Sequence, residues 1–326
     1  MADMTPPADA AGFLAAHGWA GAEIAPLAGD ASFRRYFRIR NGSRTAVLMD
    51  APPPHEDPQP FVNIARWLAE RGFAAPAILA ADVDRGLVLL EDFGDDRMRE
   101  AILAAPNRTE ALYATAIDLL VELHRHEAGP LRPYNHAELE REAGLFVEWY
   151  CPAVGIDADV ASYRAAWDDA FAQVEAPASP VTVLRDYHAE NLMLLGGGGL
   201  GLLDFQDALA GHKAYDLVSL LQDARRDVEP EIEEMMLARY RAATGAGQDF
   251  LDAYHILGAQ RNAKILGIFT RLWKRDGKPR YGAMCPRVWR YLECDLATPP
   301  LAAVARWFDT TVPPDKRGDP MEIAGR

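Results

Sequence analysis

The chain has 326 residues, about half of them apolar, a length that suits one bilobal enzyme or two domains. Its 34 basic and 48 acidic side chains give a net charge of -14, which argues against nucleic acid or an anionic membrane as the main partner. Three scattered cysteines, no signal-like N-terminus and no apolar run of about 18 residues together predict a cytoplasmic protein.

The N-terminal part of the sequence predicts a small β lobe. Asn41-Gly42 is a strong hairpin turn signal, and Phe61, Ile64 and Leu68 are spaced for one buried helix face. The expected elements are a short helix at 8–18, strands at 23–27, 35–40, 45–49, 77–82 and 86–90, and a helix at 60–71.

From residue 95 onward the pattern becomes mainly helical. The expected helices are 110–126, 139–150, 158–174, 216–226, 229–243 and 250–275. Apolar runs of strand type at 181–184, 192–195 and 200–203 interrupt them. Residues Gly196 to Gly199 are not a phosphate loop, because no Lys or Ser follows, and we expect a turn there.

Three polar residues flank these apolar runs at fixed offsets. Asp186 precedes Asn191 by five residues, and Asp204 follows Asn191 by thirteen. Kinases use this layout for phosphoryl transfer: the first Asp accepts the proton of the attacking hydroxyl, while the Asn and the later Asp hold magnesium. We expect the three side chains on a short hairpin in the larger lobe, where their oxygens suit a hard cation.

A purely structural reading of these residues is the competing interpretation. Asp and Asn are common in turns, where their side chains bond their own backbone. An acid such as Asp204 at the end of an apolar strand is nevertheless costly unless it is paired or binds a metal. That position favours the phosphotransferase interpretation, with ATP and Mg²⁺ as the expected cofactors.

At these residues the chain resembles the aminoglycoside phosphotransferase superfamily, and the resemblance covers nearly its whole length. It implies an α+β fold: a bilobal protein-kinase-like fold with a small N-terminal five-stranded antiparallel β lobe with one helix, and a larger mainly helical C-terminal lobe. The expected domains are 1–92, a nucleotide-binding lobe, and 93–326, a catalytic and substrate-binding lobe. The resemblance also places a buried Asp at position 216, which we expect to act as a helix N-cap.

Within the superfamily, several segments look like the anomeric N-acetylmuramate/N-acetylglucosamine kinases of peptidoglycan recycling. These segments are 29–38, 47–53, 204–208, 219–225, 260–267 and 271–272. The resemblance implies an ATP-dependent kinase that phosphorylates the anomeric hydroxyl and yields a sugar 1-phosphate.

The resemblance also implies which residues meet the nucleotide. The expected nucleotide-binding residues are Asp30, Ser32, Arg34, Arg35, Glu91 and Phe93. The chain departs from the kinase pattern at Met49, where a phosphate-binding Lys is usual. We expect Arg34, Arg35 or Arg38, or backbone amides, to take its place.

The motif Glu91-Asp92-Phe93-Gly94 contains a kinase-like Asp-Phe-Gly, but it comes long before the base, whereas the metal Asp must follow it. We interpret it as the hinge whose backbone pairs with adenine, with Asp92 as a solvated or capping residue.

Muramate carries a lactyl carboxylate, so its site should hold a cation. The candidate substrate residues are His188, Arg225, Arg261 and Lys264, followed by Arg271. Trp149, Trp273 or Trp289 could stack on a sugar ring, although core packing is the expectation for two of these three.

Two other functions remain open at this point. The first is a kinase of the same fold that acts on another small alcohol, such as an aminoglycoside or choline. The second is a nucleotide-binding pseudokinase, which the missing Lys at Met49 suggests and the intact acidic trio opposes. The sequence leaves open the sugar preference, the anomer and the oligomeric state.

Overall fold

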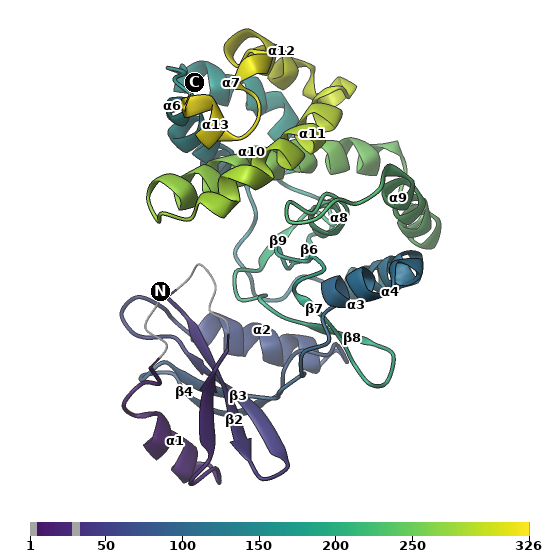
Figure 1. The fold of residues 1–326 in the computed structure, drawn as a ribbon. Helices are drawn as coiled ribbons and strands as arrows, with labels where there is room; N and C mark the ends of the chain where they lie inside the picture. The colour runs from purple at the N-terminus through teal and green to yellow at the C-terminus, as the bar shows by residue number, and fades with distance from the viewer. Residues whose placement is uncertain (1–4, 28–32, 326) are drawn as a thin grey trace. The chain divides into compact units, whose positions relative to one another are not determined.

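The computed structural model describes residues 5–27 and 33–325, and the chain forms two compact units (Figure 1). The N-terminal unit comprises Met1–Pro106 and Glu190–Asp207, and the helical unit comprises Asn107–Ala189 and Ala208–Arg326. The chain therefore divides differently from the expected ranges 1–92 and 93–326, because residues 93–106 and 190–207 group with the N-terminal unit. The functions assigned to those ranges stay predictions.

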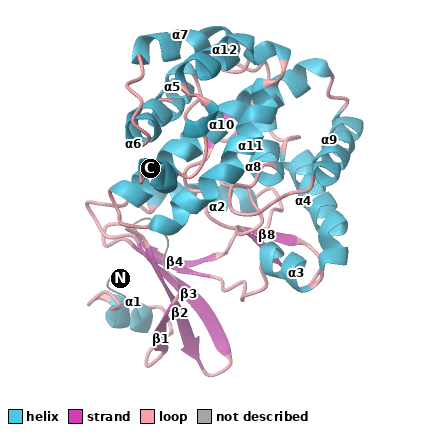
Figure 2. Ribbon diagram, turned by 45° about the horizontal axis from the view of Figure 1, so that its top comes forward, coloured by secondary structure: helices cyan, strands magenta, loops and turns pink. Residues whose placement is uncertain are grey.

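A five-stranded antiparallel sheet forms the centre of the N-terminal unit, as predicted (Figure 2). Its order is β1-β2-β3-β5-β4. The strands are β1 Glu23–Pro26, β2 Arg35–Asn41, β3 Arg44–Asp50, β4 Ile78–Asp82 and β5 Leu87–Leu90. The predicted turn at Asn41-Gly42 is confirmed: Asn41 pairs with Arg44, and Gly42 has a φ of 61°, which glycine adopts without strain.

Alternation along the strands sends one set of apolar side chains into a core. Phe37 and Ile39 of β2 and Leu48 of β3 are fully buried there. They pack with Phe13 and Leu14 of the helix α1 Ala10–Ala16. This cluster holds the sheet to its covering helix.

Two further helices and a hairpin complete the N-terminal unit. The helices are α2 Gln59–Ala69, with Phe61, Ile64 and Leu68 buried as predicted, and α3 Met98–Ala104, which the sequence analysis missed. The strands β7 Leu192–Leu194 and β8 Leu200–Leu202 form the hairpin, and residues 196–199 make its turn, as predicted.

The helical unit contains most of the predicted helices. Its elements are α4 Thr109–Leu123, α5 His136–Ala143, the π-helix Phe146–Tyr150, α6 Cys151–Ala153, α7 Val160–Phe171, β6 Val181–Val183, β9 Leu209–Gly211, α8 Ala214–Leu221, α9 Pro230–Thr244, α10 Gln248–Lys274, α11 Cys285–Leu296, α12 Ala302–Thr311 and α13 Pro320–Ala324. Short 3₁₀ helices lie at Pro106–Arg108, Pro279–Met284, Pro299–Leu301 and Pro314–Lys316. The helix expected at 139–150 is instead split into α5 and the π-helix.

Helix α10 organises this unit, because it packs against α5, α8, α11 and the π-helix. An aromatic cluster lies beside it: the ring of Phe146 stacks on Tyr150 and meets Trp289 and Phe308 edge-on or tilted. Trp289 is 2% exposed and donates to the hydroxyl of Tyr150 (2.8 Å). This tryptophan therefore serves core packing, as expected for two of the three candidates.

The strand pairing corrects one expectation about the catalytic residues. Asp186 follows β6, which pairs antiparallel with β9, whereas Asn191 and Asp204 flank the separate hairpin β7–β8. The three residues are therefore not carried by one hairpin, and β7–β8 groups with the N-terminal unit. Within the described ranges, no helix is both long and apolar enough to cross a membrane.

The loop from β9 to α8 generates a pH prediction. His212 accepts a hydrogen bond at Nδ1 from the amide of Ala214 (3.2 Å), and burial, with the charge of Lys213, lowers the pKa of His212 from 6.5 to about 4. The unfolded chain then binds more protons between those values, so stability falls as the pH drops through this window. Asn at this position keeps the acceptor but does not titrate. Relative to His212→Asn, the wild type should lose about 1 kcal/mol of unfolding free energy between about pH 7.5 and 5.5. Urea unfolding at both pH values measures this, and identical pH dependence in the two proteins would contradict the assignment.

Candidate active site

The hairpin β7–β8 brings Asn191 and Asp204 together. The amide of Leu203 donates to the carbonyl of Asn191 (3.0 Å), which continues the strand pairing one step beyond the hairpin. The two polar side chains therefore emerge at the same end, with Nδ2 of Asn191 3.5 Å from Oδ2 of Asp204. Both lie within the N-terminal unit.

The backbone of Asp204 adopts a left-handed conformation with a φ of 57°. Asp tolerates this region better than most residues, but it still costs about 1 kcal/mol or more. Its carboxylate accepts a hydrogen bond from Nε2 of Gln206 (2.9 Å), which also reaches Asp207 (3.3 Å). Gln206, which the sequence analysis did not single out, thus holds both carboxylates.

These residues fit the magnesium site that kinases of this pattern require. Among the described residues, no group of three or more His, Cys, Asp or Glu side chains could hold a metal ion. Magnesium at a nucleotide site takes only one or two protein carboxylates and completes its octahedron with phosphates and water. The amide and carboxylate oxygens of Asn191 and Asp204 supply a donor set of that kind.

The three arginines that are candidates to replace the phosphate-binding lysine differ in their partners. Nη2 of Arg34 lies 3.9 Å from Oδ1 of Asp204, and its side chain is 11% exposed. Arg35 forms a two-point ion pair with the buried Asp50 (2.5 and 2.8 Å) across the β2–β3 ladder. Arg34 therefore lies beside a predicted metal ligand, whereas Arg35 pairs with an acid of the neighbouring strand.

The third candidate, Arg38, binds the segment after β5. Its guanidinium contacts Asp92 (2.8 Å), Asp95 (2.9 Å) and the carbonyl of Gly94 (3.1 Å). Of the two roles expected for Asp92, solvated or capping, the structure excludes the first: its side chain is 5% exposed and pairs with Arg38, while its carboxylate accepts the amide of Gly94 (3.0 Å) as a local cap. Arg38 fixes the shape of the predicted hinge.

Within that hinge, the backbone keeps the groups that adenine recognition would need. The amide of Glu91 donates to the carbonyl of Ala77 (2.9 Å). In the part of the chain that the structure describes, the carbonyl of Glu91 and the amide of Phe93 make no backbone hydrogen bond. One acceptor and one donor two residues apart thus remain for a ligand.

Three other positions complete the predicted nucleotide site. Asp30 and Ser32 belong to the segment 28–32, outside the described residues. Met49, at the place of the usual phosphate-binding Lys, is fully buried in β3 between Tyr36 and Val88 in the strand register. It is a core residue.

In the helical unit, Asp216 fixes the loop that carries Asp186. The carboxylate of Asp216 accepts the amides of Leu184 (2.7 Å) and Arg185 (2.8 Å), and the hydroxyl of Ser219 donates to the carbonyl of Arg185 (3.0 Å). The expectation that Asp216 is an N-cap was wrong, because α8 starts at Ala214 and this side chain points to the loop. Burial raises the pKa of Asp216 to about 7, although the two amides oppose that shift.

His188 and Arg225 form a pair two residues beyond the predicted base. His188 is 2% exposed, and its Nε2 lies 3.0 Å from Nη1 of Arg225. Burial, with the charges of Arg225 and Arg261, lowers the pKa of His188 well below its usual range. The imidazole is therefore neutral, Nε2 accepts from the guanidinium, and the ring proton is on Nδ1.

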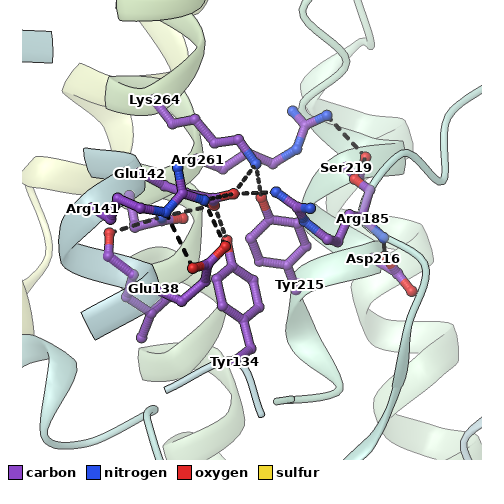
Figure 3. A network of polar contacts seen from close by, with 12 residues as sticks. Tyr134, Glu138, Arg141, Glu142, Arg185, Tyr215, Asp216, Ser219, Arg261 and Lys264 are labelled. Atoms are coloured by element: carbon purple, nitrogen blue, oxygen red, sulfur yellow. Dashed lines mark hydrogen bonds and ion pairs between the residues drawn. The ribbon is translucent and has the colours of Figure 1, made fainter. Parts of the chain in front are cut away.

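The other two substrate candidates have internal partners. Arg261 is 3% exposed and donates to the hydroxyl of Ser219 (2.9 Å). Nζ of Lys264 lies 2.9 Å from the carboxylate of Glu142 and 3.3 Å from the hydroxyl of Tyr215 (Figure 3). The structure brings Arg225 to His188, whereas Arg261 and Lys264 have partners in the polar network that Figure 3 shows.

Comparisons with known proteins identify the family to which the chain belongs. The model of the phosphotransferase enzyme family matches residues 23–254. The chain is 40% identical to an N-acetylmuramate/N-acetylglucosamine kinase of Caulobacter vibrioides, covering 94% of this chain and 97% of the relative. It is also 40% identical to a Pseudomonas aeruginosa protein of the same name, covering 87% and 88%.

Solved structures show the same fold at low identity. The choline kinase of Streptococcus pneumoniae superposes with a TM-score of 0.62 at 15% identity, covering 86% of this chain and 93% of that one. A spectinomycin phosphotransferase gives a TM-score of 0.62 at 11% identity, covering 93% and 98%. The predicted kinase-like fold is confirmed.

The contact between the hairpin and the hinge generates a second prediction. A Cβ at Gly201 would lie 2.7 Å from the ring of Phe93 and 3.3 Å from Leu195, whereas a Cβ at Gly199 in the same hairpin would meet nothing within 4 Å. Gly201→Ala should therefore lower the unfolding free energy by about 1–3 kcal/mol and weaken ATP binding through Phe93. Gly199→Ala should change neither. Denaturant unfolding and nucleotide titration measure both effects, and equal behaviour of the two variants would refute the packing argument.

Proposed function

Because the chain belongs to the phosphotransferase enzyme family, we propose that it is an ATP-dependent kinase of N-acetylmuramate and N-acetylglucosamine. The product is the sugar 1-phosphate, formed at the anomeric hydroxyl. The identity of about 40% to relatives of that name, over most of both chains, supports the substrate class. The pairing of Asn191 with Asp204 at one end of β7–β8 is the structural observation that carries the phosphotransfer chemistry.

Asp186 acts as the proton acceptor in this proposal. The anomeric oxygen attacks the γ-phosphorus, its proton passes to the Asp186 carboxylate, and the bond from phosphorus to the bridging oxygen breaks, releasing ADP. The anomeric hydroxyl is more acidic than other sugar hydroxyls, so a carboxylate base suffices. The transition state is loose, so most of the rate enhancement comes from alignment and charge neutralisation.

The nucleotide is held by the N-terminal unit. Magnesium, when bound on Asn191 and Asp204, neutralises charge that develops on the phosphates. Arg34, beside Asp204, presents a guanidinium that can bond two phosphate oxygens and takes the role of the lysine absent at Met49. The carbonyl of Glu91 and the amide of Phe93 bind the adenine edge.

The sugar is held by the helical unit. Arg225 is half-buried and donates to the neutral imidazole of His188, and its guanidinium is the cation that we assign to the lactyl carboxylate of muramate. His188, with its proton on Nδ1, offers a hydrogen-bond donor close in sequence to Asp186. Arg261 and Lys264 support the site from within the buried network. The use of ATP accords with the predicted cytoplasmic location.

A substrate panel with ATP turnover as the readout tests this function. Turnover should be high with N-acetylmuramate and N-acetylglucosamine and absent with aminoglycosides and choline. The Asp186→Asn variant should lose roughly 10²–10⁴-fold in kcat, because the amide cannot accept the proton. Robust turnover of aminoglycosides alone would replace the proposed substrate, and unchanged kcat in the variant would remove Asp186 from its role.

Removal of one metal ligand tests the magnesium assignment. Asn191→Ala should raise the magnesium concentration for half-maximal activity by roughly 10-fold or more, as loss of a ligand weakens the site. The matched control is Asn63→Ala on the exposed face of α2, which should leave the magnesium requirement unchanged. A magnesium titration that gives one curve for both variants would exclude Asn191 as a ligand.

A further inference from the structure

A single buried carboxylate, that of Glu142 in α5, organises the polar network of Figure 3. Glu142 is 1% exposed, and its oxygens accept the hydroxyl of Tyr134, the guanidinium of Arg185 and, at 2.9 Å, the ammonium of Lys264. Nε2 of Gln260 also reaches it at 3.4 Å. Donors from three other parts of the helical unit thus converge on one side chain.

The cluster is ionised. Burial alone would raise the pKa of Glu142, but the charges of Lys264 and Arg185, with the Tyr134 hydroxyl, lower it to about 2. The side chains of Arg185 and Lys264 are 15% and 13% exposed, so these charges interact in a largely water-free setting. The carboxylate is a permanent anion at any working pH.

Arg185, one of the partners of Glu142, immediately precedes the predicted base Asp186. Arg185 has a φ of 72°, a left-handed conformation that a long side chain rarely adopts. Its amide donates to Asp216, its carbonyl accepts from Ser219, and its guanidinium binds Glu142. Three separate contacts therefore hold this residue in a conformation that it would not choose by itself.

The position of Asp186 follows from that of Arg185. The amide of Asp186 donates to the carbonyl of Leu184 (2.9 Å), and its carbonyl accepts the amide of His188 (3.1 Å), which gives a tight turn. A rotation at Arg185 would therefore move the next carboxylate directly. Two of these three tethers act on the backbone, whereas Glu142 binds the side chain, whose guanidinium also lies 5.9 Å from the centroid of the Tyr134 ring.

We propose that Glu142 is a positioning residue for phosphoryl transfer: by holding the Arg185 guanidinium, it sets the orientation of the Asp186 carboxylate toward the sugar hydroxyl. The inference rests on the proposed function, because it assigns Asp186 the role of proton acceptor. Glu142 does not touch the substrate. It acts through Arg185.

Stability alone does not explain this cluster. Buried ions lose their hydration, and well-packed apolar residues in their place are often as stable or more stable. A structural role would require only that Glu142, Arg185 and Lys264 neutralise each other somewhere in the core. Here Arg185 directly precedes the base Asp186 and has a strained backbone conformation. In a loop without such contacts, Arg185 would relax to a more favourable conformation.

The test shortens the carboxylate side chain without removing its charge. Glu142→Asp withdraws the carboxylate by one methylene, so the variant keeps the anion but loosens the contact with Arg185. We expect kcat for amino-sugar phosphorylation to fall roughly 10–100-fold, the scale of an ångström-sized misplacement, while the KM values for sugar and ATP change less than about 3-fold. Thermal unfolding of the same samples checks that the variant is folded.

The matched control is Arg141→Gln. Arg141 is another cation near the same carboxylate, at 3.6 Å, but its side chain is 58% exposed and it pairs with Glu138. This variant should keep the wild-type kcat and KM.

Tyr134→Phe is the second test if Glu142→Asp does not fold, because it removes one hydrogen bond from Glu142 and leaves the ion pairs with Arg185 and Lys264. It should lower kcat roughly 3–10-fold at unchanged KM.

Wild-type kcat in a folded Glu142→Asp or, failing that, in Tyr134→Phe would overturn the inference. A raised sugar KM at constant kcat would also overturn it, since Glu142 would then act on binding. If the wild type forms no sugar phosphate at all, the proposed function fails instead, and the two failures are thus distinguishable.

Discussion

The carboxylate of Asp216 accepts two backbone amides, those of Leu184 and Arg185, and the geometry of the catalytic loop depends on this contact. Hydrogen bonds inside a protein contribute about 0.5–1.5 kcal/mol each, so the two together are on the scale of the strain of about 1–3 kcal/mol in a left-handed residue such as Arg185. Because Asp216 lies in the first turn of α8, the loop after β6 is tied to a helix rather than left to its own turn chemistry. A residue that could be taken for a simple helix cap is therefore the anchor of the proposed base.

A second constraint positions the two predicted metal ligands. The β7–β8 register allows Asn191 and Asp204 to meet, because a slip of one residue would turn one of them to the opposite face. Gly201 in that hairpin leaves room for the ring of Phe93. The hairpin that carries the two metal ligands therefore packs against the hinge within the N-terminal unit. The base is carried by the helical unit. Each unit thus holds its own reacting group by its own internal contacts.

The sequence predicted the local features well. Apolar runs around residues 192–195 and 200–203, separated by glycines, predicted the hairpin, and the spacing of the polar residues around it indicated a phosphotransferase, the family to which the chain belongs. Long-range contacts were not predictable in the same way. The bond from Leu184 to Asp216 joins residues 32 apart, and nothing in the local pattern of either segment specifies the partner. The strand β9 at Leu209–Gly211 is too short for periodicity to reveal.

Some features that were not predicted do have a recognisable pattern in the sequence. Glu142 follows Leu139 by three residues and precedes Phe146 by four, so a charged residue stands on the buried face of its helix. That position predicts a paired, buried carboxylate, although not its partners. In α11, Val288, Leu292 and Leu296 recur at helical spacing and could have identified that helix.

In the proposed mechanism, Asp186, with a metal site on Asn191 and Asp204, directs the γ-phosphate of ATP to the anomeric oxygen of an N-acetylated amino sugar. Phosphorus NMR of the product formed from N-acetylmuramate and MgATP is the decisive experiment. We expect a new phosphomonoester signal that is split into a doublet by the single anomeric proton. A triplet from phosphate on a CH₂–O group, or ADP and free phosphate without any phosphosugar, would contradict it.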